Sequence, residues 1–386
     1  MRREEAVAVV GRGPAGLAAA TFLTAAHIPV VVVADGRGTL ELWSGEWHFL
    51  SREGRDPVSD PYAVWEHRPP HPQVRWSRDA WGVWWGRLLD AWRAAGIPVP
   101  ERVPSRNCWT LGSAGVPRPT FVAAGWQYQT QELEPLWLVG FSGLSDSLVD
   151  WQAAEYEAAC GRDAGVSVWE PPAELQREGS PLRWAAYFER HGVEDLAADL
   201  RRALPAESRG RPLVLPQVMG FRRTEALLDE LQRRLDRPVA ELPLGVPCLG
   251  GWRWQQRWES WLTDQGVGWI QGRVVQIGDG RIVLDDGRTW RPAGVILATG
   301  GVLGGGIAVG VDGQAVNTAT GEPLGTALTA EDLEAVGLPA RGAGYATAGR
   351  SLAGCQPDRE GDGGAMNVWS AAQAVAWWRG GAGSGS

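Results

Sequence analysis

Cysteine is scarce in this sequence, and the few cysteines stand far apart. Four occur in 386 residues, at Cys108, Cys160, Cys248 and Cys355, and no two form a Cys-x-x-Cys pair. Such spacing excludes an iron–sulfur or zinc framework within the chain and gives no sign of a disulfide scaffold. A reducing compartment suits the chain, so we expect a cytoplasmic protein with no metal of its own.

Basic stretches and long apolar helices are lacking as well. The formal net charge is −8 at pH 7, and no basic stretch offers a surface for nucleic acid. Residues 292–311 carry no charge, but seven of them are glycine and one is proline, which favours a strand and a loop over a membrane-spanning helix. Residues 1–5 include acids and lead directly into an apolar run, so we expect no secretory signal. Membrane contact would then come through a partner protein, at the inner membrane face.

Tryptophan, by contrast, is abundant, with 23 residues. Several recur at helical spacing in two stripes, Trp81, Trp84, Trp85 and Trp92, and Trp254, Trp258 and Trp261. Bulky apolar side chains at this spacing predict buried helix faces. Tryptophan also anchors protein interfaces, so an interface with a partner protein is the alternative for part of the excess.

The strongest functional signal is a glycine motif near the N-terminus. An apolar run at 6–10 leads into Gly11-x-Gly13-x-x-Gly16, and a small-residue helix follows without a break. In a dinucleotide-binding turn the first glycine permits the tight bend, the second lets the backbone approach the phosphates, and the third lets the helix pack on the strand. We therefore expect Gly11, Gly13, Ala15 and Gly16 to hold the pyrophosphate of a dinucleotide.

A second strand supports this prediction. Residues 29–34 form a fully apolar, β-branched run that is typical of a buried parallel strand. The run ends at Asp35, 19 residues after Gly16. An acid at this distance can bind the ribose hydroxyls of an adenosine, but the glycines that follow also fit a plain turn, and the spacing leaves both interpretations open.

Helices and strands alternate along the rest of the chain. Apolar periodicity predicts helices at 79–95, 147–162, 193–204, 221–235 and 252–265. From 267 the period is two, with a hairpin around 278–280, a buried strand at 294–301 that ends in Ala-Thr-Gly, and a helix that opens at 362–367. The simplest organisation builds a dinucleotide-binding domain from both chain ends, at 1–99 and 266–379. A substrate or partner domain at 100–265 is then inserted, and 380–386 form a flexible tail.

Three of these motifs occur in the same order in flavoproteins of the glutathione-reductase structural class, which this sequence resembles. In that class the N-terminal glycine motif, the Ala-Thr-Gly strand and a C-terminal helix start converge on one FAD. The resemblance implies an α/β fold, with a Rossmann-like FAD-binding domain and an inserted α+β domain. It implies that Ser44 and Gly45 lie near the flavin ring, and Thr299 and Gly300 by the adenosine-side loops. It also implies that backbone N–H groups reach the flavin pyrimidine edge from Gly349, Gly364, Ala365 and Met366.

A closer resemblance covers nearly the whole length. The segments at 42–51, 138–146, 215–220, 237–243 and 357–364 are similar to the B subunit of the anaerobic glycerol-3-phosphate dehydrogenase. That family implies flavin-dependent oxidation of glycerol 3-phosphate to dihydroxyacetone phosphate with quinone as the acceptor. It also implies two partners, a catalytic flavoprotein subunit and an iron–sulfur subunit that docks on the membrane. The family is often described with FMN in this component, but FMN has no pyrophosphate for the glycine motif to hold, so the residues favour FAD.

Candidate catalytic residues are few. Oxidation of a carbinol by hydride transfer to flavin N5 requires a group that takes the hydroxyl proton and a cation that holds the substrate phosphate. Arg359, in the loop before the C-terminal helix, is the first choice for the phosphate, and Arg222 and Arg223 come second. His48 and Glu360 are the candidates for the base. Two other functions stay open: a non-catalytic electron-relay or scaffold flavin subunit of the same complex, and another FAD-dependent small-acid oxidoreductase of fumarate-reductase type.

Overall fold

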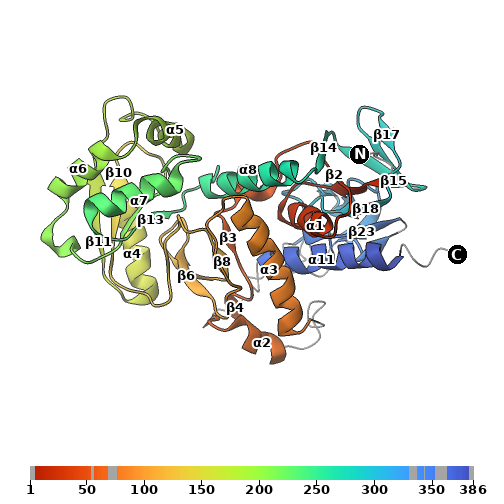
Figure 1. Cartoon of the computed structure of the whole chain (residues 1–386), viewed down its shortest axis with the longest axis horizontal. Coiled ribbons are helices and arrows are strands. Elements are labelled where there is room, and N and C mark those ends of the chain that lie inside the picture. Colours follow the sequence, from red (N-terminus) through yellow and green to blue (C-terminus); the bar gives the residue numbers. More distant parts are fainter. Residues whose placement is uncertain are drawn as a thin grey trace.

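The computed structural model describes residues 5–53, 56–67, 76–329, 337–342, 344–352 and 363–381. Figure 1 shows three groups of elements along the longest axis of the molecule. A parallel sheet near both chain ends lies on one side, a second sheet with its own helices lies on the other, and helix α3 (Arg78–Ala94) lies between them. Within the described ranges, no helix is long and apolar enough to cross a membrane.

The first sheet is built from strands far apart in the sequence. Its order is β14-β2-β1-β18-β23-β22. The parallel members are β1 (Val7–Val10), β2 (Val30–Ala34), β14 (Gly268–Gln271), β18 (Gly294–Leu297) and β23 (Tyr345–Thr347), and the edge strand β22 (Arg341–Gly342) is antiparallel. The valine-rich strands β1 and β2 are buried, as their composition predicts. Helices α1 (Pro14–Ala25) and α11 (Gly363–Gly381) pack against each other beside this sheet.

An antiparallel meander connects β14 to β18. It consists of β15 (Val274–Gly278), β16 (Arg281–Leu284) and β17 (Thr289–Trp290), and the pairing of β15 with β16 confirms the predicted hairpin. A second antiparallel group follows β18, with β19 (Ile307–Val309), β20 (Gln314–Asn317) and β21 (Pro323–Thr326). The first strand of this parallel sheet, β1, runs through the glycine turn directly into helix α1. The predicted α/β fold is confirmed.

The second sheet lies within 136–242. Its order is β11-β10-β12-β13, with all neighbours parallel: β10 (Leu136–Phe141), β11 (Ala164–Trp169), β12 (Leu213–Pro216) and β13 (Val239–Leu242). Its helices are α4 (Val149–Cys160), α5 (Pro181–His191), α6 (Glu194–Ala203) and α7 (Thr224–Leu235). The predicted helices at 147–162, 193–204 and 221–235 are therefore confirmed within three residues, whereas α5 was not predicted.

The middle of the molecule joins segments from both sides of the predicted domain boundary at 100. Strands β6 (Cys108–Leu111), β7 (Pro117–Thr120) and β9 (Gln129–Thr130) form a small antiparallel sheet. Strand β8 (Val122–Ala123) pairs with β3 (Glu46–Trp47), which follows β2 in the chain. The shorter elements are β4 (Arg52–Glu53), β5 (Asp56–Pro57), α2 (Pro61–His67) and the 3-10 turns η2 (Thr39–Leu42), η3 (Ala206–Ser208) and η4 (Gly349–Ser351).

The two tryptophan stripes meet in one core, which confirms the prediction of buried helix faces. The fully buried indoles in this core include those from α3, from helix α8 (Leu249–Asp264) and from β3: Trp81, Trp85, Trp92, Trp254, Trp258 and Trp47. The ring centroid of Trp47 lies 4.7 Å from that of Trp92 and 6.0 Å from that of Trp258. Each buried indole removes roughly 150–250 Å² from water. This core therefore fixes β3, α3 and α8 against one another.

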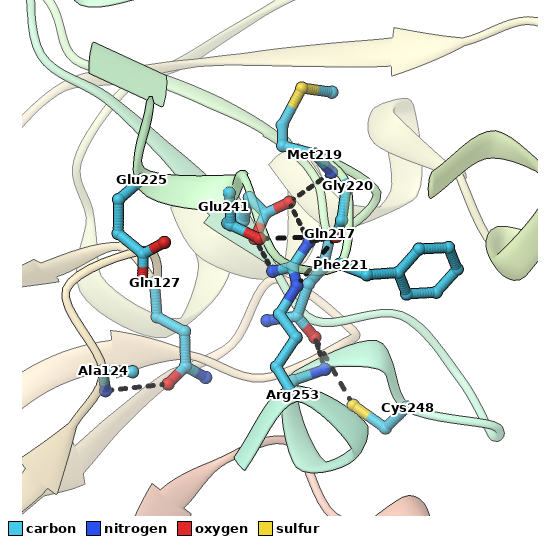
Figure 2. A network of polar contacts seen from close by, with 12 residues as sticks. Ala124, Gln127, Gln217, Met219, Gly220, Phe221, Glu225, Glu241, Cys248 and Arg253 are labelled. Carbon is cyan, nitrogen blue, oxygen red and sulfur yellow. Dashed lines mark hydrogen bonds and ion pairs between the residues drawn. The ribbon is translucent and has the colours of Figure 1, made fainter. Parts of the chain in front are cut away.

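Helix α8 begins at Leu249, three residues before its predicted start. A Cβ atom at Gly251 would lie 1.7 Å from the carbonyl oxygen of Leu40, and one at Gly250 would lie 2.4 Å from that of Ser44. Only glycine lets the helix approach this backbone so closely. Because glycine is a poor helix former, the sequence pattern concealed this first turn. Further along, Arg253 of α8 reaches Glu241 of the second sheet, as Figure 2 shows.

Candidate functional site

The glycine loop between β1 and α1 has the geometry of a phosphate cradle. Gly11 has a positive φ of +113°, and a Cβ atom there would lie 2.1 Å from the carbonyl oxygen of Ala298. A Cβ atom at Gly16 would lie 2.1 Å from the carbonyl oxygen of Gly11. At Gly13 the nearest atom to such a Cβ is Thr39 Oγ1 at 3.7 Å, so the space before this residue is open. Two glycines are thus required by the fold, and the middle one faces free volume.

This free volume belongs to a cavity of about 290 Å³. Its walls include the glycine loop, Asp35 at the carboxyl end of β2, and Thr299 and Gly300 after β18. Helix α1 starts at Pro14 with Gly13 as its N-cap, and no side chain caps it. The first-turn N–H groups of α1 therefore face this cavity with the positive end of the helix dipole behind them.

A larger cavity of about 1140 Å³ adjoins the first. The walls of both contain Pro14, Thr39, Gly300, Gly304, Arg350 and Asn367. The larger space extends from these residues to β3, β7 and the start of α11, and Trp43 and Trp47 are among its lining residues. The two cavities thus meet at the glycine loop and form one elongated space with a narrow and a wide end.

Of the residues that the sequence predicts near the flavin, some line the two cavities and others make hydrogen bonds within the protein. Gly364 and Met366 line the wide end, and Gly349 lines the narrow end. The N–H of Ala365 donates to the carbonyl oxygen of His48 at 3.0 Å, so this group is already used within the protein. Thr299 Oγ1 lies 3.0 Å from Ser351 Oγ, which fixes the Ala-Thr-Gly strand end to η4.

Ser44 and Gly45 stand one step behind the cavity wall, while their neighbours Trp43 and Glu46 line it. The hydroxyl of Ser44 donates to Glu46 Oε2 at 3.0 Å. A Cβ atom at Gly45 would lie 3.0 Å from the indole nitrogen of Trp254, so this residue packs on the tryptophan core. The structure therefore brings the expected segment to the cavity through different side chains from those named in the sequence analysis.

The catalytic candidates are divided between described and undescribed parts of the chain. Arg359 and Glu360 lie outside the described residues. Arg222 and Arg223 precede α7, where their N–H groups bind Glu189, and neither lines the cavities described above. His48 does line the wide end.

His48 is held in one orientation by its ring nitrogen Nδ1, which lies 3.1 Å from the carbonyl oxygen of Pro119. Burial lowers the pKa of His48 below its ordinary value, against the opposing effect of Glu46. The guanidinium groups of Arg118 and Arg52 lower this pKa further. The imidazole is therefore neutral at pH 7, which is the state in which it can accept a proton.

Sequence reasoning missed several residues of the cavity wall: Thr39, Glu46, Arg118, Arg350 and Asn367. Three of them directly follow residues that it did name, since Glu46 follows Gly45, Arg350 follows Gly349 and Asn367 follows Met366. Arg118 carries no such signal. It reaches the site because the β3–β8 pairing brings the segment around 117–123 beside β3.

Comparison with curated proteins gives relatives with one shared name. A probable B subunit of anaerobic glycerol-3-phosphate dehydrogenase from Halobacterium salinarum is 27% identical over 342 residues, which are 80% of this chain and 76% of the relative. The B subunit of the anaerobic glycerol-3-phosphate dehydrogenase of Vibrio cholerae is 25% identical over 302 residues, 71% of this chain and 66% of the relative. No family model matches the chain.

The solved structures that the comparison found are more distant in sequence than the curated relatives. A tryptophan 5-halogenase is 12% identical with a TM-score of 0.34, covering 97% of this chain and 66% of that chain. A 3-ketosteroid Δ1-dehydrogenase from Sterolibacterium denitrificans is 13% identical with a TM-score of 0.31. The match covers 77% of this chain and 48% of that chain. The resemblance stated from the sequence is confirmed by the curated relatives: the chain is a homologue of proteins named as the B subunit of anaerobic glycerol-3-phosphate dehydrogenase.

Proposed function

We propose that this chain binds FAD and oxidises glycerol 3-phosphate to dihydroxyacetone phosphate, as the B subunit of a quinone-linked dehydrogenase. The observation that carries the proposal is the junction of two cavities at one glycine loop. A narrow space beside a helix N-terminus suits a pyrophosphate and an adenosine, and a wide space suits a flavin ring with a small substrate beside it. The names of the curated relatives support the choice of substrate.

The residues present fit FAD better than FMN. The open space before Gly13 and the uncapped start of α1 lie where a pyrophosphate would be held. Asp35, in the wall of the same cavity, is placed to accept hydrogen bonds from ribose hydroxyls. FMN has one phosphate and no adenosine, so it would leave Asp35 and part of the glycine loop without a ligand group. When bound, the flavin supplies the hydride acceptor at N5.

The substrate would lie in the wide end, where the chain offers cations and an imidazole. Arg52, Arg118 and Arg350 line this cavity, and the sequence contains no lysine, so every cationic side chain here is a guanidinium. Guanidinium groups bind phosphate through paired hydrogen bonds. We assign the phosphate to this set together with Arg359. His48 takes the proton of the carbinol hydroxyl as the carbonyl forms.

The name of the relatives also supports a multi-subunit assembly. We propose a catalytic flavoprotein and an iron–sulfur protein as partners, and contact with the inner membrane face through the latter. In that assembly this chain would work on the cytoplasmic side. Reconstitution with the co-expressed partners, followed by quinone reduction, is the measurement that examines this part.

The first experiment is to purify the chain, record its visible spectrum, and release and identify the chromophore. FAD supports the cofactor assignment, whereas FMN would overturn the role given to the glycine loop. The second step is anaerobic reduction of the loaded protein by glycerol 3-phosphate, with succinate as the matched alternative. Reduction by succinate alone would favour a dicarboxylate oxidoreductase. A flavin that neither substrate reduces, in a chain that the complex still requires, would favour the relay function.

A further inference from the structure

A fully buried carboxylate lies beside His48, and only one of its oxygens is used. The side chain of Glu46 has no exposed surface, while that of His48 is 23% exposed toward the cavity. Glu46 Oε2 accepts the Ser44 hydroxyl at 3.0 Å. Glu46 Oε1 has no hydrogen-bond partner in the part of the chain that the structure describes. Burying a polar atom without a partner is costly, so the arrangement requires an explanation.

The orientation of the imidazole points to that explanation. Since Nδ1 lies 3.1 Å from the carbonyl oxygen of Pro119, it carries the hydrogen of the neutral ring, and Nε2 carries a lone pair. Nε2 lies 3.8 Å from Glu46 Oε2. Two acceptors that face each other at this distance make no hydrogen bond. Once Nε2 gains a proton, the same pair becomes attractive.

The titratable groups around this pair come from four strands and from the residue before α8. Glu46 belongs to β3, Arg52 to β4 and Arg118 to β7, and the two guanidiniums oppose protonation of His48. Cys108 of β6 faces Glu46 as well, and burial raises the pKa of its thiol to about 11, so it stays neutral. Cys248, before α8, is also buried, and the pKa of its thiol is likewise raised to about 11. Glu46 therefore favours the charged form of the imidazole, as does the hydrogen bond between Nδ1 and Pro119.

We propose that Glu46 is the positioning residue of His48, a buried carboxylate that stabilises the imidazolium formed when His48 accepts the proton of a secondary alcohol. This inference rests on the proposed function. In the reaction the O–H bond of the carbinol breaks and its proton goes to His48 Nε2. The C–H bond would break with its electron pair, for which a bound oxidised flavin would supply the hydride acceptor, and the C–O bond would become a carbonyl. In this proposal Glu46 acts through the imidazole ring.

A histidine titration by NMR tests the inference without any substrate. The chain has only five histidines, so selective labelling gives few signals, and His48→Gln assigns the one of interest. In Glu46→Gln the His48 pKa should fall by about one unit, the effect of one charge at this distance in a polar environment. Glu46→Asp keeps the charge further away and should give a smaller fall. Glu225→Gln removes a carboxylate that pairs with Arg257, and should leave the His48 pKa unchanged.

An unchanged His48 pKa in Glu46→Gln, in a variant with native circular dichroism, would overturn the inference. If that variant does not fold, Glu46→Asp decides, because an unchanged pKa there would count equally against it. A second readout is the rate of flavin reduction against pH. Because loss of Glu46 lowers the His48 pKa, the acidic limb should move to lower pH, with a roughly tenfold loss in the plateau rate and little change in KM. If glycerol 3-phosphate fails as a substrate, the titration still stands, so the two proposals fail separately.

Discussion

Arg253 of α8 and Glu241 of β13 form an ion pair in which both side chains are fully buried. The guanidinium also donates to the carbonyl oxygen of Gly220, from Nε at 3.0 Å and from Nη2 at 2.7 Å. Glu241 Oε1 in turn accepts the N–H of Met219 at 2.7 Å, as Figure 2 shows. Both charged side chains of this network have partners. The network connects helix α8 to the second sheet.

Removal of one partner from this pair should be strongly destabilising. In Glu241→Gln the guanidinium of Arg253 keeps its charge in a buried place without a counter-charge, which costs about 3–5 kcal/mol. The midpoint of chemical denaturation, followed by tryptophan fluorescence, measures the loss. Glu225→Gln breaks the more exposed pair with Arg257 and should cost about 1 kcal/mol or less.

Replacement of both partners provides the control for the buried pair. Arg253→Met combined with Glu241→Leu removes both charges and should recover part of the stability lost in Glu241→Gln. If the double variant is as unstable as the single one, the cost comes from packing and lost hydrogen bonds to Gly220 and Met219, and the charge argument is wrong.

Two glycines of the loop between β1 and α1 should respond differently to alanine. At Gly16 the new Cβ would meet the backbone oxygen of Gly11 at 2.1 Å, so Gly16→Ala should destabilise the fold by roughly 1–3 kcal/mol. At Gly13 the φ angle is −78° and the space is open, so Gly13→Ala should leave the melting temperature nearly unchanged. The methyl group of the new alanine at position 13 would occupy the space assigned to the pyrophosphate. The affinity of this variant for the flavin should therefore fall on the order of tenfold or more.

Fluorescence titration with FAD and with FMN separates these effects. Gly13→Ala should weaken the binding of FAD much more than the binding of FMN, because only FAD carries the pyrophosphate. Equal losses for both flavins would contradict the role assigned to Gly13.

Local sequence patterns predicted the first sheet and its hairpin well, because the residues that specify these elements are close together in the sequence. The apolar runs at 6–10 and 29–34 became buried parallel strands, and the hairpin around 278–280 formed where its turn residues lie. The tryptophan stripes at 81–92 and 254–261 became buried helix faces for the same reason. Each of these elements is specified by residues that are near one another in the sequence.

The wide end of the cavity could not be predicted in the same way, because its contacts join distant residues. His48 is oriented by Pro119, 71 residues away, through the β3–β8 pairing. Glu46 appeared in the sequence as one acid among 45 acidic residues, and only its burial distinguishes it. The early start of α8 depends on Leu40 and Ser44, which approach its glycines from another part of the chain.

Cys108 and Cys248 should be unreactive in the folded protein. Burial raises the pKa of both Cys108 and Cys248 to about 11. At pH 8 such thiols are ionised in about 0.1% of molecules, and the thiolate is the nucleophile. Iodoacetamide at pH 8 should therefore leave both unmodified in the native protein and modify them in guanidinium chloride, as peptide mass spectrometry would show. Rapid labelling of Cys248 in the native state would contradict its burial.

Trp47 should link the stability of the core to the binding of the cofactor. It is 1% exposed within the indole cluster and also forms part of the wall of the wide cavity, whereas Trp258, equally buried, does not line it. Truncation of either to alanine should cost about 3–5 kcal/mol in unfolding free energy, from lost burial and the cavity that remains. Only Trp47→Ala should also weaken flavin binding, since it alters the wall that would face the ring. Denaturation midpoints and flavin titrations of the two variants, measured below their melting temperatures, provide the comparison. Equal flavin affinity in both would mean that the indole of Trp47 supports the core alone, and that the cofactor lies elsewhere in the wide end.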